Sequence, residues 1–469
     1  MSVTFDESWK LALVGRNGRG KTTLMKLLLG ELAFSGQIHS DKAFIYFPQS
    51  VADPTMLTKY VLDELYDAPD WQIQRELNLL DFPLDSLWRP FESLSGGEQT
   101  KVLLAGLFLD EGNFPLIDEP TNHLDLASRA KIAQYLQSKK TGYIVSSHDR
   151  QFLNVVSDHL LAIERQDITL LATNFSTYEL EKKRRDHFEL AENEKLKSEI
   201  SRLKQTAREK AEWSRDRERD KYGNPNQKGS GAIGGSGFIG ARAARMMKKA
   251  KVLEHRMTSE IAEKEKLLKN LEKVDQLAMH YQPSHHQVLL FEEELTVTFD
   301  GKALFSPIKL GQKAREITAI TGPNGVGKSQ LLQQLIASAE KRQLRISCVR
   351  QLYGDNQGSL KSFADKHGLD YPDFLNNLRK LGMPREAFSK KIEQLSMGQQ
   401  KKVELAKSLA TPAELFIWDE PLNYLDVFNQ EQIEVLLQTV KPAMLIVEHD
   451  AQFIENVADQ VIELKTSED

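Results

Sequence analysis

The chain has 469 residues, of which 40% are hydrophobic, and this length suits two domains of ordinary size with a connector between them. The formal net charge is −5 and there is a single cysteine, so the composition excludes a disulfide framework and predicts no general attraction to nucleic acid. No apolar run approaches the ~18 residues of a membrane helix and no cleavable signal is recognisable, so we expect a soluble cytoplasmic protein without a membrane partner.

A glycine-rich loop near the start of the chain lies between a predicted strand, residues 9–14, and a predicted buried helix, residues 22–29. This loop, residues 15–22 (GRNGRGKT), matches the phosphate-loop pattern, in which backbone N–H groups and the lysine hold phosphates and the final hydroxyl is offered to Mg²⁺. A glycine loop before a helix can also be a simple tight turn, but the complete pattern in this context favours nucleotide binding. The nucleotide-contacting residues expected here are Gly15, Asn17, Gly18, Gly20, Lys21, Thr22 and Thr23.

Polar side chains follow three further predicted strands of the first half. Gln49, the pair Asp118 and Glu119, and His148 each come directly after a short apolar run. Because open α/β sheets bind ligands at such strand ends, we expect Thr22, Gln49 and Asp118 to hold Mg²⁺. Glu119 is then placed to polarise an attacking water, with His148 beside it as a second catalytic group. Taken alone, each of these residues would be an ordinary surface or core group.

Residues 94–99 (LSGGEQ) precede a helix-like run at residues 100–109. A serine at this place is an ordinary helix N-cap, and a helix N-terminus also binds anions, so capping and γ-phosphate contact are compatible roles. Ser95, Gly96 and Gly97 lie far along the sequence from the phosphate loop. This distance suggests that they contact the nucleotide of another domain.

Residues 176–285 form a connector that matches neither half of the chain. Apolar residues recur at three- and four-residue spacing on both sides of a glycine-rich break, which predicts two amphipathic helices that pair antiparallel. The first of them, residues 176–221, would be about 65–70 Å long. The seam residues are Leu196, Ile200, Leu203, Ala207 and Ala211, followed by Leu253, Met257, Ile261, Leu268 and Leu271.

The break between these helices carries a concentration of positive charge. Residues 228–251 include six basic and no acidic side chains, on a chain that is acidic overall. A flexible glycine loop beside a solvated helix face is the simpler interpretation for an isolated segment. A rigidly presented basic tip instead favours contact with structured RNA, to which Phe238 and Ile239 could add stacking or apolar contacts.

The second half of the chain repeats the first. A second phosphate loop, residues 322–329 (GPNGVGKS), again lies between a predicted strand and a predicted helix. The offset is 307 positions at the loop lysine, and it is 301 at the serine of the LSGGEQ-type stretch, the strand-end aspartate and the histidine. An equal offset at three landmarks indicates a duplicated domain. The nucleotide-contacting residues expected in this half are Gly322, Asn324, Gly325, Gly327, Lys328, Ser329, Gln351, Ser396 and Gly398, with Ser329, Gln351 and Asp419 on Mg²⁺ and Glu420 and His449 catalytic.

These motifs, present twice, resemble the ATP-binding cassette superfamily, and two cassettes joined by a long charged connector resemble its ABC-F proteins. Residues 118–125 (DEPTNHLD) match the first cassette of that family, whereas residues 419–426 (DEPLNYLD) depart at Leu422 and Tyr424. The resemblance implies an α/β fold with two P-loop NTPase domains joined by a long antiparallel α-helical hairpin. We place the first cassette at residues 1–175, the connector at 176–285 and the second cassette at 286–469.

The resemblance also implies that the cassettes close head-to-tail on two ATP molecules with Mg²⁺. Ser396 and Gly398 would then complete the first site, and Ser95, Gly96 and Gly97 the second. Phe299 matches the position at which the family stacks an aromatic ring on adenine. Its counterpart in the first half is missing, so a late start codon, a truncated gene or a first site without a stacked ring remain as alternatives, and full activity of the first site is in question.

The glycine-rich tip and residues 237–251 (GFIGARAARMMKKAK) resemble the Lsa-type antibiotic-resistance branch of ABC-F. This resemblance implies a monomer that binds the bacterial ribosome near the exit tRNA site, contacts 23S rRNA and tRNA through its tip, and dislodges lincosamides, pleuromutilins and streptogramin A compounds. Three alternatives stay open: a housekeeping ABC-F translation factor, the energising subunit of a drug exporter, and a DNA-repair type of ATPase.

Overall fold

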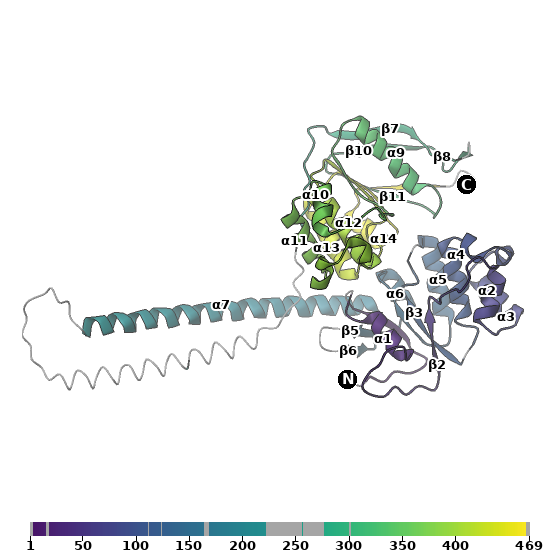
Figure 1. The fold of residues 1–469 in the computed structure, drawn as a ribbon, viewed down its shortest axis with the longest axis horizontal. Helices are drawn as coiled ribbons and strands as arrows, with labels where there is room; N and C mark the ends of the chain where they lie inside the picture. The colour runs from purple at the N-terminus through teal and green to yellow at the C-terminus, as the bar shows by residue number, and fades with distance from the viewer. Residues whose placement is uncertain are drawn as a thin grey trace, which may run out of the picture. The chain divides into compact units, whose positions relative to one another are not determined.

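The computed structural model of the chain describes residues 3–15, 18–110, 112–122, 124–163, 168–221, 256, 276–299 and 302–465 (Figure 1). The chain divides into two compact units, one made of Met1–Thr177 with Val274–Asp469 and the other of Tyr178–Lys273. In the first unit, we call β1–β6 with α1–α6 the first cassette and β7–β15 with α9–α14 the second cassette.

Six strands form the sheet of the first cassette in the spatial order β2-β3-β4-β1-β5-β6. The first five are parallel and β6 runs antiparallel to β5. The strands are β1 (Lys10–Val14), β2 (Ala43–Phe47), β3 (Asn113–Asp118), β4 (Tyr143–Ser146), β5 (His159–Ile163) and β6 (Ile168–Leu171). Because β1, β3 and β4 are parallel neighbours, their carboxyl ends meet at one edge of the sheet, where ligands bind in open α/β folds.

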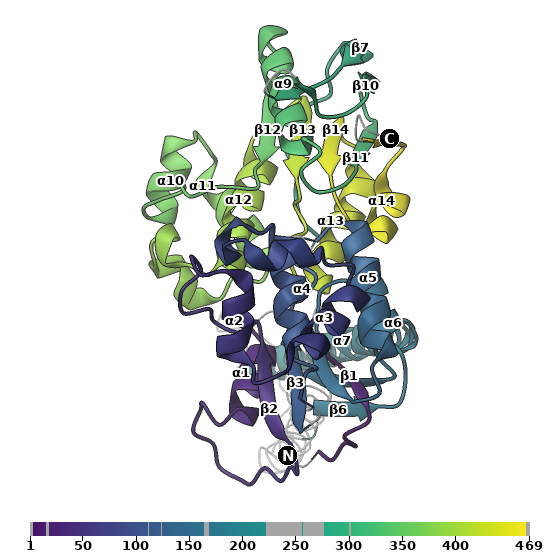
Figure 2. The same cartoon turned by 90° about the vertical axis from the view of Figure 1, so that its right-hand side faces the viewer.

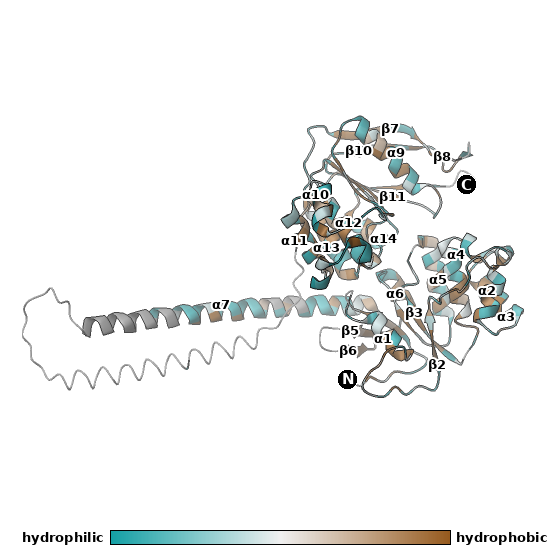
Figure 3. Ribbon diagram, viewed as in Figure 1, coloured by the Kyte–Doolittle hydropathy of each residue, from teal (hydrophilic) through white to brown (hydrophobic). Residues whose placement is uncertain are grey.

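The second cassette repeats this sheet in the order β12-β13-β14-β11-β15, with all strands parallel. Its strands are β11 (Ile317–Thr321), β12 (Ile346–Val349), β13 (Leu415–Asp419), β14 (Met444–Val447) and β15 (Gln460–Glu463). Two small antiparallel pairs precede them, β7 (Val288–Leu295) with β10 (Ile308–Lys313) and β8 (Thr298–Phe299) with β9 (Lys302–Ala303). Figure 3 shows the strands of both sheets as hydrophobic, in keeping with parallel sheets covered on both faces.

Each cassette also contains a group of short helices that ends in the helix after the LSGGEQ-type stretch. In the first cassette they are α2 (Thr58–Leu65), α3 (Asp70–Leu79), η1 (Leu84–Trp88), η2 (Phe91–Ser93) and α4 (Gly96–Gly106). In the second cassette they are α10 (Leu360–Lys366), α11 (Tyr371–Lys380), η3 (Arg385–Ser389), η4 (Ile392–Gln394) and α12 (Met397–Ala410). Figure 2 shows α10, α11 and α12 together on the β12 side of the sheet. We call each group the helical segment of its cassette.

The remaining helices pack on the sheets. They are α1 (Lys21–Leu28), α5 (Leu126–Ser138) and α6 (Arg150–Val156) in the first cassette, and α9 (Lys328–Lys341), α13 (Val427–Val440) and α14 (Ala451–Val457) in the second. Helix α1 covers a core that includes Leu11, Leu13, Met25, Phe114 and Ile144, all nearly or completely buried. The predicted α/β class and the tandem arrangement are confirmed.

The second unit contains helix α7 (Phe175–Lys221), which has 47 residues. At about 1.5 Å per residue it is about 70 Å long, as the periodicity predicts. Ile200 is 6% exposed, and Leu196 and Leu203 are less exposed than the charged residues between them, while the antiparallel pairing of two helices stays a prediction. The returning helix and the basic tip, residues 228–251, lie outside the described residues.

Candidate nucleotide-binding sites

The first phosphate loop joins β1 to α1 in a conformation that only glycine adopts easily. Gly18 and Gly20 have φ angles of 78° and 94°, in the left-handed region. The Lys21 ammonium donates to the carbonyl of Gly15 over 2.8 Å, so its side chain lies folded back over the loop. Burial lowers the pKa of Lys21 against the opposing effect of Glu119. Asn17 lies outside the described residues.

The second phosphate loop, between β11 and α9, repeats this geometry. Gly325 and Gly327 have φ angles of 81° and 96°, and a Cβ at Gly322 would lie 2.8 Å from the Leu464 carbonyl. The Lys328 ammonium donates to the carbonyls of Gly322 and Pro323 over 2.8 Å each. Both loops are therefore built to present backbone N–H groups and a lysine to phosphate.

The hydroxyl and the aspartate expected to bind Mg²⁺ lie together in each cassette. Thr22 Oγ1 donates to Asp118 Oδ2 over 2.8 Å, and Ser329 Oγ donates to Asp419 Oδ2 over 2.7 Å. Asp419 Oδ1 is a buried oxygen without a hydrogen-bond partner, and so is Gln49 Oε1. A hydroxyl and a carboxylate with an unpartnered buried oxygen are donors that Mg²⁺ prefers, so Ser329 and Asp419 fit the ion.

A glutamate follows the strand-end aspartate, the expected Mg²⁺ ligand, in each cassette and lies against a histidine. Glu119 Oε1 is 3.2 Å from His148 Nε2, and Glu420 Oε1 is 3.3 Å from His449 Nε2. Both glutamates have positive φ angles, 53° and 46°, which is uncommon for a residue with a Cβ and is found at functional sites. The backbone therefore turns sharply after β3 and β13 and directs both carboxylates toward the histidines.

The two glutamates differ in their electrostatic surroundings. Burial raises the pKa of Glu119 to about 7, supported by the nearby Asp118 carboxylate and opposed by Lys21. Burial acts on Glu420 as well, but the His449 ring, Lys328 and the Gln351 amide outweigh it and lower the pKa of Glu420 to about 2. Burial and the charge of Lys21 lower the pKa of His148 to about 3, so this ring is neutral.

The two glutamines, expected to be equivalent, point to different partners. Gln351 Nε2 donates to Glu420 Oε2 over 3.2 Å, inside its own site. Gln49 Nε2 instead donates to the Tyr66 hydroxyl on the residue that follows α2. Only the second cassette thus joins its glutamine to its glutamate.

The LSGGEQ-type stretches begin helices α4 and α12. Ser95 and Ser396 are the N-caps, each in a capping box with the third helical residue, Glu98 or Gln399. Gly96, Gly97 and Gly398 lie in the first turns of these helices. The helices start several residues earlier than the apolar runs suggested, because the capping box orders the polar first turn. Whether these serines complete the opposite phosphate site stays a prediction.

Besides Tyr66, three residues that the sequence did not single out contact the predicted site residues. Tyr46 Oη donates to Asp118 Oδ2 over 3.0 Å, and Ser146 Oγ donates to Asp118 Oδ1. Asn423 Nδ2 donates to Glu420 Oε2 over 2.6 Å. Strand register could have suggested Ser146, because it pairs with Asp118 across β3 and β4. The contact of Tyr46 with Asp118 depends on the direction of the Tyr46 side chain, which strand register does not give. Phe299 ends β8, and its side chain lies outside the described part of the chain.

Hydrogen bonds join the cassettes within the first unit. Asp125, the N-cap of α5, accepts from the backbone N–H of Asn324 in the second phosphate loop over 3.1 Å. Arg150, in α6, donates to the Val427 carbonyl at the start of α13 over 3.2 Å. The second phosphate loop is therefore in direct contact with the segment that follows the Asp-Glu pair of the first cassette.

Comparisons with known proteins agree with this geometry. A family model described as ABC transporter matches residues 1–122 and 305–423. The chain is 26% identical to the ribosome protection protein VmlR of Bacillus subtilis, covering 96% of this chain and 80% of that protein. It is 25% identical to the erythromycin resistance ATP-binding protein MsrA of Staphylococcus epidermidis, covering 97% and 92%.

Further comparisons give the same architecture. The ATP-binding protein Uup of Caulobacter vibrioides is 26% identical, covering 97% of this chain and 72% of that protein. The archaeal ribosome recycling factor aABCE1, solved in complex with the ribosomal stalk protein aP1, superposes with a TM-score of 0.64 at 18% identity, covering 98% of this chain and 84% of that chain. Among the described residues, no helix combines the length and apolarity needed to cross a membrane.

Proposed function

The chain belongs to the ABC transporter family of ATP-binding cassette proteins, and from this membership we propose that its ATPase activity drives binding to and release from the bacterial ribosome. As a cassette protein it binds and hydrolyses ATP. The tandem cassettes have relatives such as VmlR and MsrA, which agrees with the ABC-F resemblance. This proposal includes membership of the Lsa-type branch and protection from drugs at the peptidyl transferase centre. It also includes a cytoplasmic monomer and domain boundaries at residues 175/176 and 285/286.

The duplicated constellation of loop lysine, hydroxyl, aspartate, glutamate and histidine is the observation that supports two ATP sites. Each lysine binds phosphate, and each aspartate with its hydroxyl partner, Thr22 or Ser329, would hold Mg²⁺. Bound Mg²⁺ supplies positive charge next to the transferred phosphoryl group. Glu119 and Glu420 orient the attacking water and accept its proton, and the histidines hold these carboxylates in place.

Helix α7 supports the ribosome as the partner. It is too long for an ordinary linker and carries charge along its length, and the ribbon in Figure 3 is coloured mainly as hydrophilic over its described residues. The basic residues 228–251 beyond it would contact rRNA, whose backbone charge dominates such recognition. VmlR is named as a ribosome protection protein and aABCE1 as a ribosome recycling factor, and both match this chain over nearly its full length.

The proposal is tested with the variant Glu119→Gln/Glu420→Gln. Without the two carboxylates ATP should stay bound and the cassettes closed, so the variant should pellet with 70S ribosomes in ATP but not in its absence. The control is Lys21→Ala/Lys328→Ala, which should not pellet under either condition. Equal occupancy with and without ATP would overturn the proposal.

Drug protection is separated from a housekeeping translation role by deleting residues 229–237. A protection factor should lose lincomycin tolerance in cells and keep ATP-dependent pelleting, because the deletion shortens only the predicted tip. If the chain without residues 229–237 confers the same lincomycin tolerance as the full chain, a role for the tip is contradicted. No tolerance from either form would favour the housekeeping role.

A further inference from the structure

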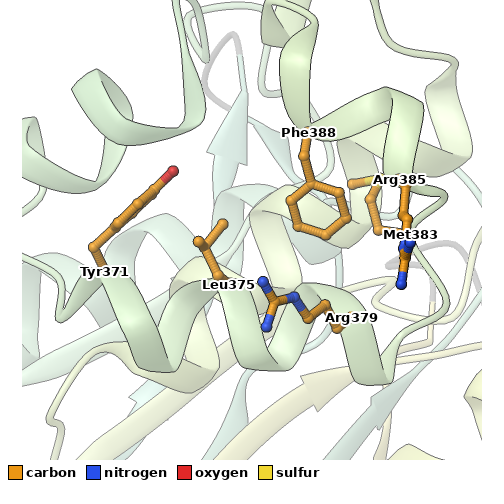
Figure 4. Close-up of a pocket in the computed structure, with 6 residues that line it drawn as sticks. All are labelled: Tyr371, Leu375, Arg379, Met383, Arg385 and Phe388. Carbon is orange, nitrogen blue, oxygen red and sulfur yellow. The ribbon is translucent and has the colours of Figure 1, made fainter.

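A pocket of about 700 Å³ opens on the helical segment of the second cassette, away from every residue assigned to ATP. It lies between α11 and η3 (Figure 4). The residues that line it are Tyr371, Leu375, Arg379, Met383, Arg385 and Phe388. Figure 4 shows Tyr371, Leu375 and Arg379 along α11, with Phe388 facing them from the opposite wall. We call this the α11 pocket.

The α11 pocket combines an apolar floor with a cationic rim. Tyr371, Leu375 and Phe388 are partly buried and pack on the core of the helical segment, and Met383 is 6% exposed. Arg379 and Arg385 are exposed. Neither arginine forms an ion pair with a residue in the described part of the chain. Two free guanidinium groups thus stand next to two accessible aromatic rings.

The first cassette shows that this pocket is not a by-product of the fold. Helix α3 and η1 have the same lengths as α11 and η3 and lie 301 positions earlier, at the offset that relates the ATP-site residues. The positions that correspond to the pocket lining are Asp70, Gln74, Asn78, Phe82, Leu84 and Leu87. The duplicated backbone therefore carries neither arginine nor the facing Tyr and Phe in the first cassette.

The charge of the surrounding segment is reversed as well. Residues 371–391 contain five basic side chains (Arg379, Lys380, Arg385, Lys390 and Lys391) and two acidic ones (Asp373 and Glu386), a balance of +3. Residues 70–90 contain two basic and four acidic side chains, a balance of −2. A basic segment on a chain with a net charge of −5 indicates a polyanionic partner.

We propose that the α11 pocket binds RNA, with one unstacked base against Tyr371 and Phe388 and the flanking phosphates on Arg379 and Arg385. Single-stranded and looped RNA is recognised by stacking on aromatic rings and by arginine, whose planar fork matches phosphate. A base and its phosphates would use both the apolar floor and the rim of this pocket. The inference rests on the proposed function in one respect: the ribosome would be the source of the RNA.

Photocrosslinking tests the assignment on the ribosome. The Glu119→Gln/Glu420→Gln chain is loaded with ATP onto ribosomes that carry 4-thiouridine, irradiated and digested, and the crosslinked peptides are identified by mass spectrometry. We expect a crosslink between residues 371–391 and RNA, and its loss when Arg379→Asn/Arg385→Leu introduces the residues of the first cassette. The control, Lys361→Asn/Lys366→Leu on α10, removes equal charge from exposed positions and should keep the crosslink.

A measurement without ribosomes separates this inference from the proposed function. The full chain is titrated with a fluorescent single-stranded oligoribonucleotide at several salt concentrations. Tyr371→Ala should weaken binding by about fivefold to 150-fold, the range for one stacked base. Arg379→Asn/Arg385→Leu should reduce the slope of log affinity against log salt by about 1.4, because each lost phosphate contact on a single strand contributes about 0.7.

The outcomes are distinguishable. If the trapped chain fails to pellet but the oligoribonucleotide binds with these losses, the proposed function fails and the RNA pocket stands. If the chain pellets and residues 371–391 crosslink only to a ribosomal protein, or if oligoribonucleotide binding is equal in the wild type and both pocket variants, the RNA assignment is overturned. Unchanged ATP turnover in the pocket variants shows that they are folded.

Discussion

The two cassettes share a sheet order and the residues proposed to hold phosphate, but they differ in what supports those residues. The Asp118 carboxylate accepts hydrogen bonds from three hydroxyls, those of Thr22, Tyr46 and Ser146. Within the described part of the chain, the Asp419 carboxylate accepts only from Ser329 and keeps one buried oxygen unpartnered. The positions that match Tyr46 and Ser146 in strand register are Cys348 and Val447, which lack a hydroxyl. The groups proposed to touch nucleotide are thus duplicated, while the side chains behind them are not.

A second difference explains a departure of the second Asp-Glu motif. In the first cassette, Thr121 and Ser147 share a hydrogen bond of 2.7 Å between their hydroxyls. At the matching positions Leu422 cannot do this, and Glu448 instead accepts from the Leu422 backbone N–H over 2.8 Å. The change from Thr to Leu is therefore accompanied by a change from Ser to Glu that keeps the turn connected to the following strand.

The largest expected loss of stability follows from replacing the buried carboxylate in each helical segment by an amide. Glu404 is completely buried and accepts from Arg350, Lys407 and Asn356. Glu404→Gln should lower the free energy of unfolding by about 3–5 kcal/mol, because it removes the buried negative charge that pairs with Arg350 and with the partly buried Lys407. The measurement is chemical denaturation, with hydrogen exchange showing that the loss is centred on the second cassette.

The first cassette has a buried carboxylate of its own at a different position, and Glu76→Gln removes the negative charge that accepts from Lys139 and the Tyr135 hydroxyl. It should destabilise the first cassette and leave hydrogen exchange in α11 and α12 unchanged. Exchange that rises equally in both cassettes for either variant would contradict independent helical segments.

Low pH should remove the stability that Glu404 and Glu76 contribute in the wild type. Burial opposes ionisation of Glu404, but Arg350 and Lys407 outweigh it and lower its pKa below the ordinary 4.5; Lys139 and Tyr135 do the same for Glu76. Both groups thus stabilise the fold fully above about pH 4.5, and this stability is lost as the pH falls through the lowered values. The midpoint temperature of thermal unfolding should fall less steeply between pH 7 and pH 3 in the two Gln variants than in the wild type.

The sequence indicated the groups that we propose to touch nucleotide, but not the groups behind them. Lys21, Asp118 and Glu119 could be proposed because residue type and spacing in a phosphate-loop domain leave few alternatives. Neither the opposite directions of Gln49 and Gln351 nor the contact of Tyr46 with Asp118 could be predicted, because each depends on a side chain elsewhere in the fold. The α11 pocket escaped notice because its residues are spaced like an ordinary amphipathic helix.

A smaller loss of stability is expected when the contact between Glu448 and Leu422 is replaced by the hydroxyl pair of the first cassette. Glu448→Ser removes the acceptor for the buried N–H groups of Leu422 and His449 and should cost about 1–3 kcal/mol. Adding Leu422→Thr recreates the hydroxyl pair of the first cassette and should recover part of this loss. The double-mutant cycle, followed by urea denaturation, should give a coupling of about 0.5 kcal/mol or more. Additive losses would show that the two positions are independent.

The smallest expected effect is on the Mg²⁺ concentration that the first site requires for nucleotide binding. Tyr46→Phe removes one of the three hydroxyls that occupy Asp118 and keeps the ring, so the carboxylate becomes more available to the ion. In the Lys328→Ala background, which removes the phosphate-binding lysine of the second site, the Mg²⁺ concentration for half-maximal binding of a fluorescent ATP analogue to the first site should fall by roughly fivefold, the equivalent of one hydrogen bond of about 1 kcal/mol. Tyr60→Phe, an exposed tyrosine of the same cassette, is the control and should change nothing. An unchanged or higher Mg²⁺ requirement for Tyr46→Phe would mean that the Tyr46 hydroxyl positions Asp118 for the ion instead of competing with it.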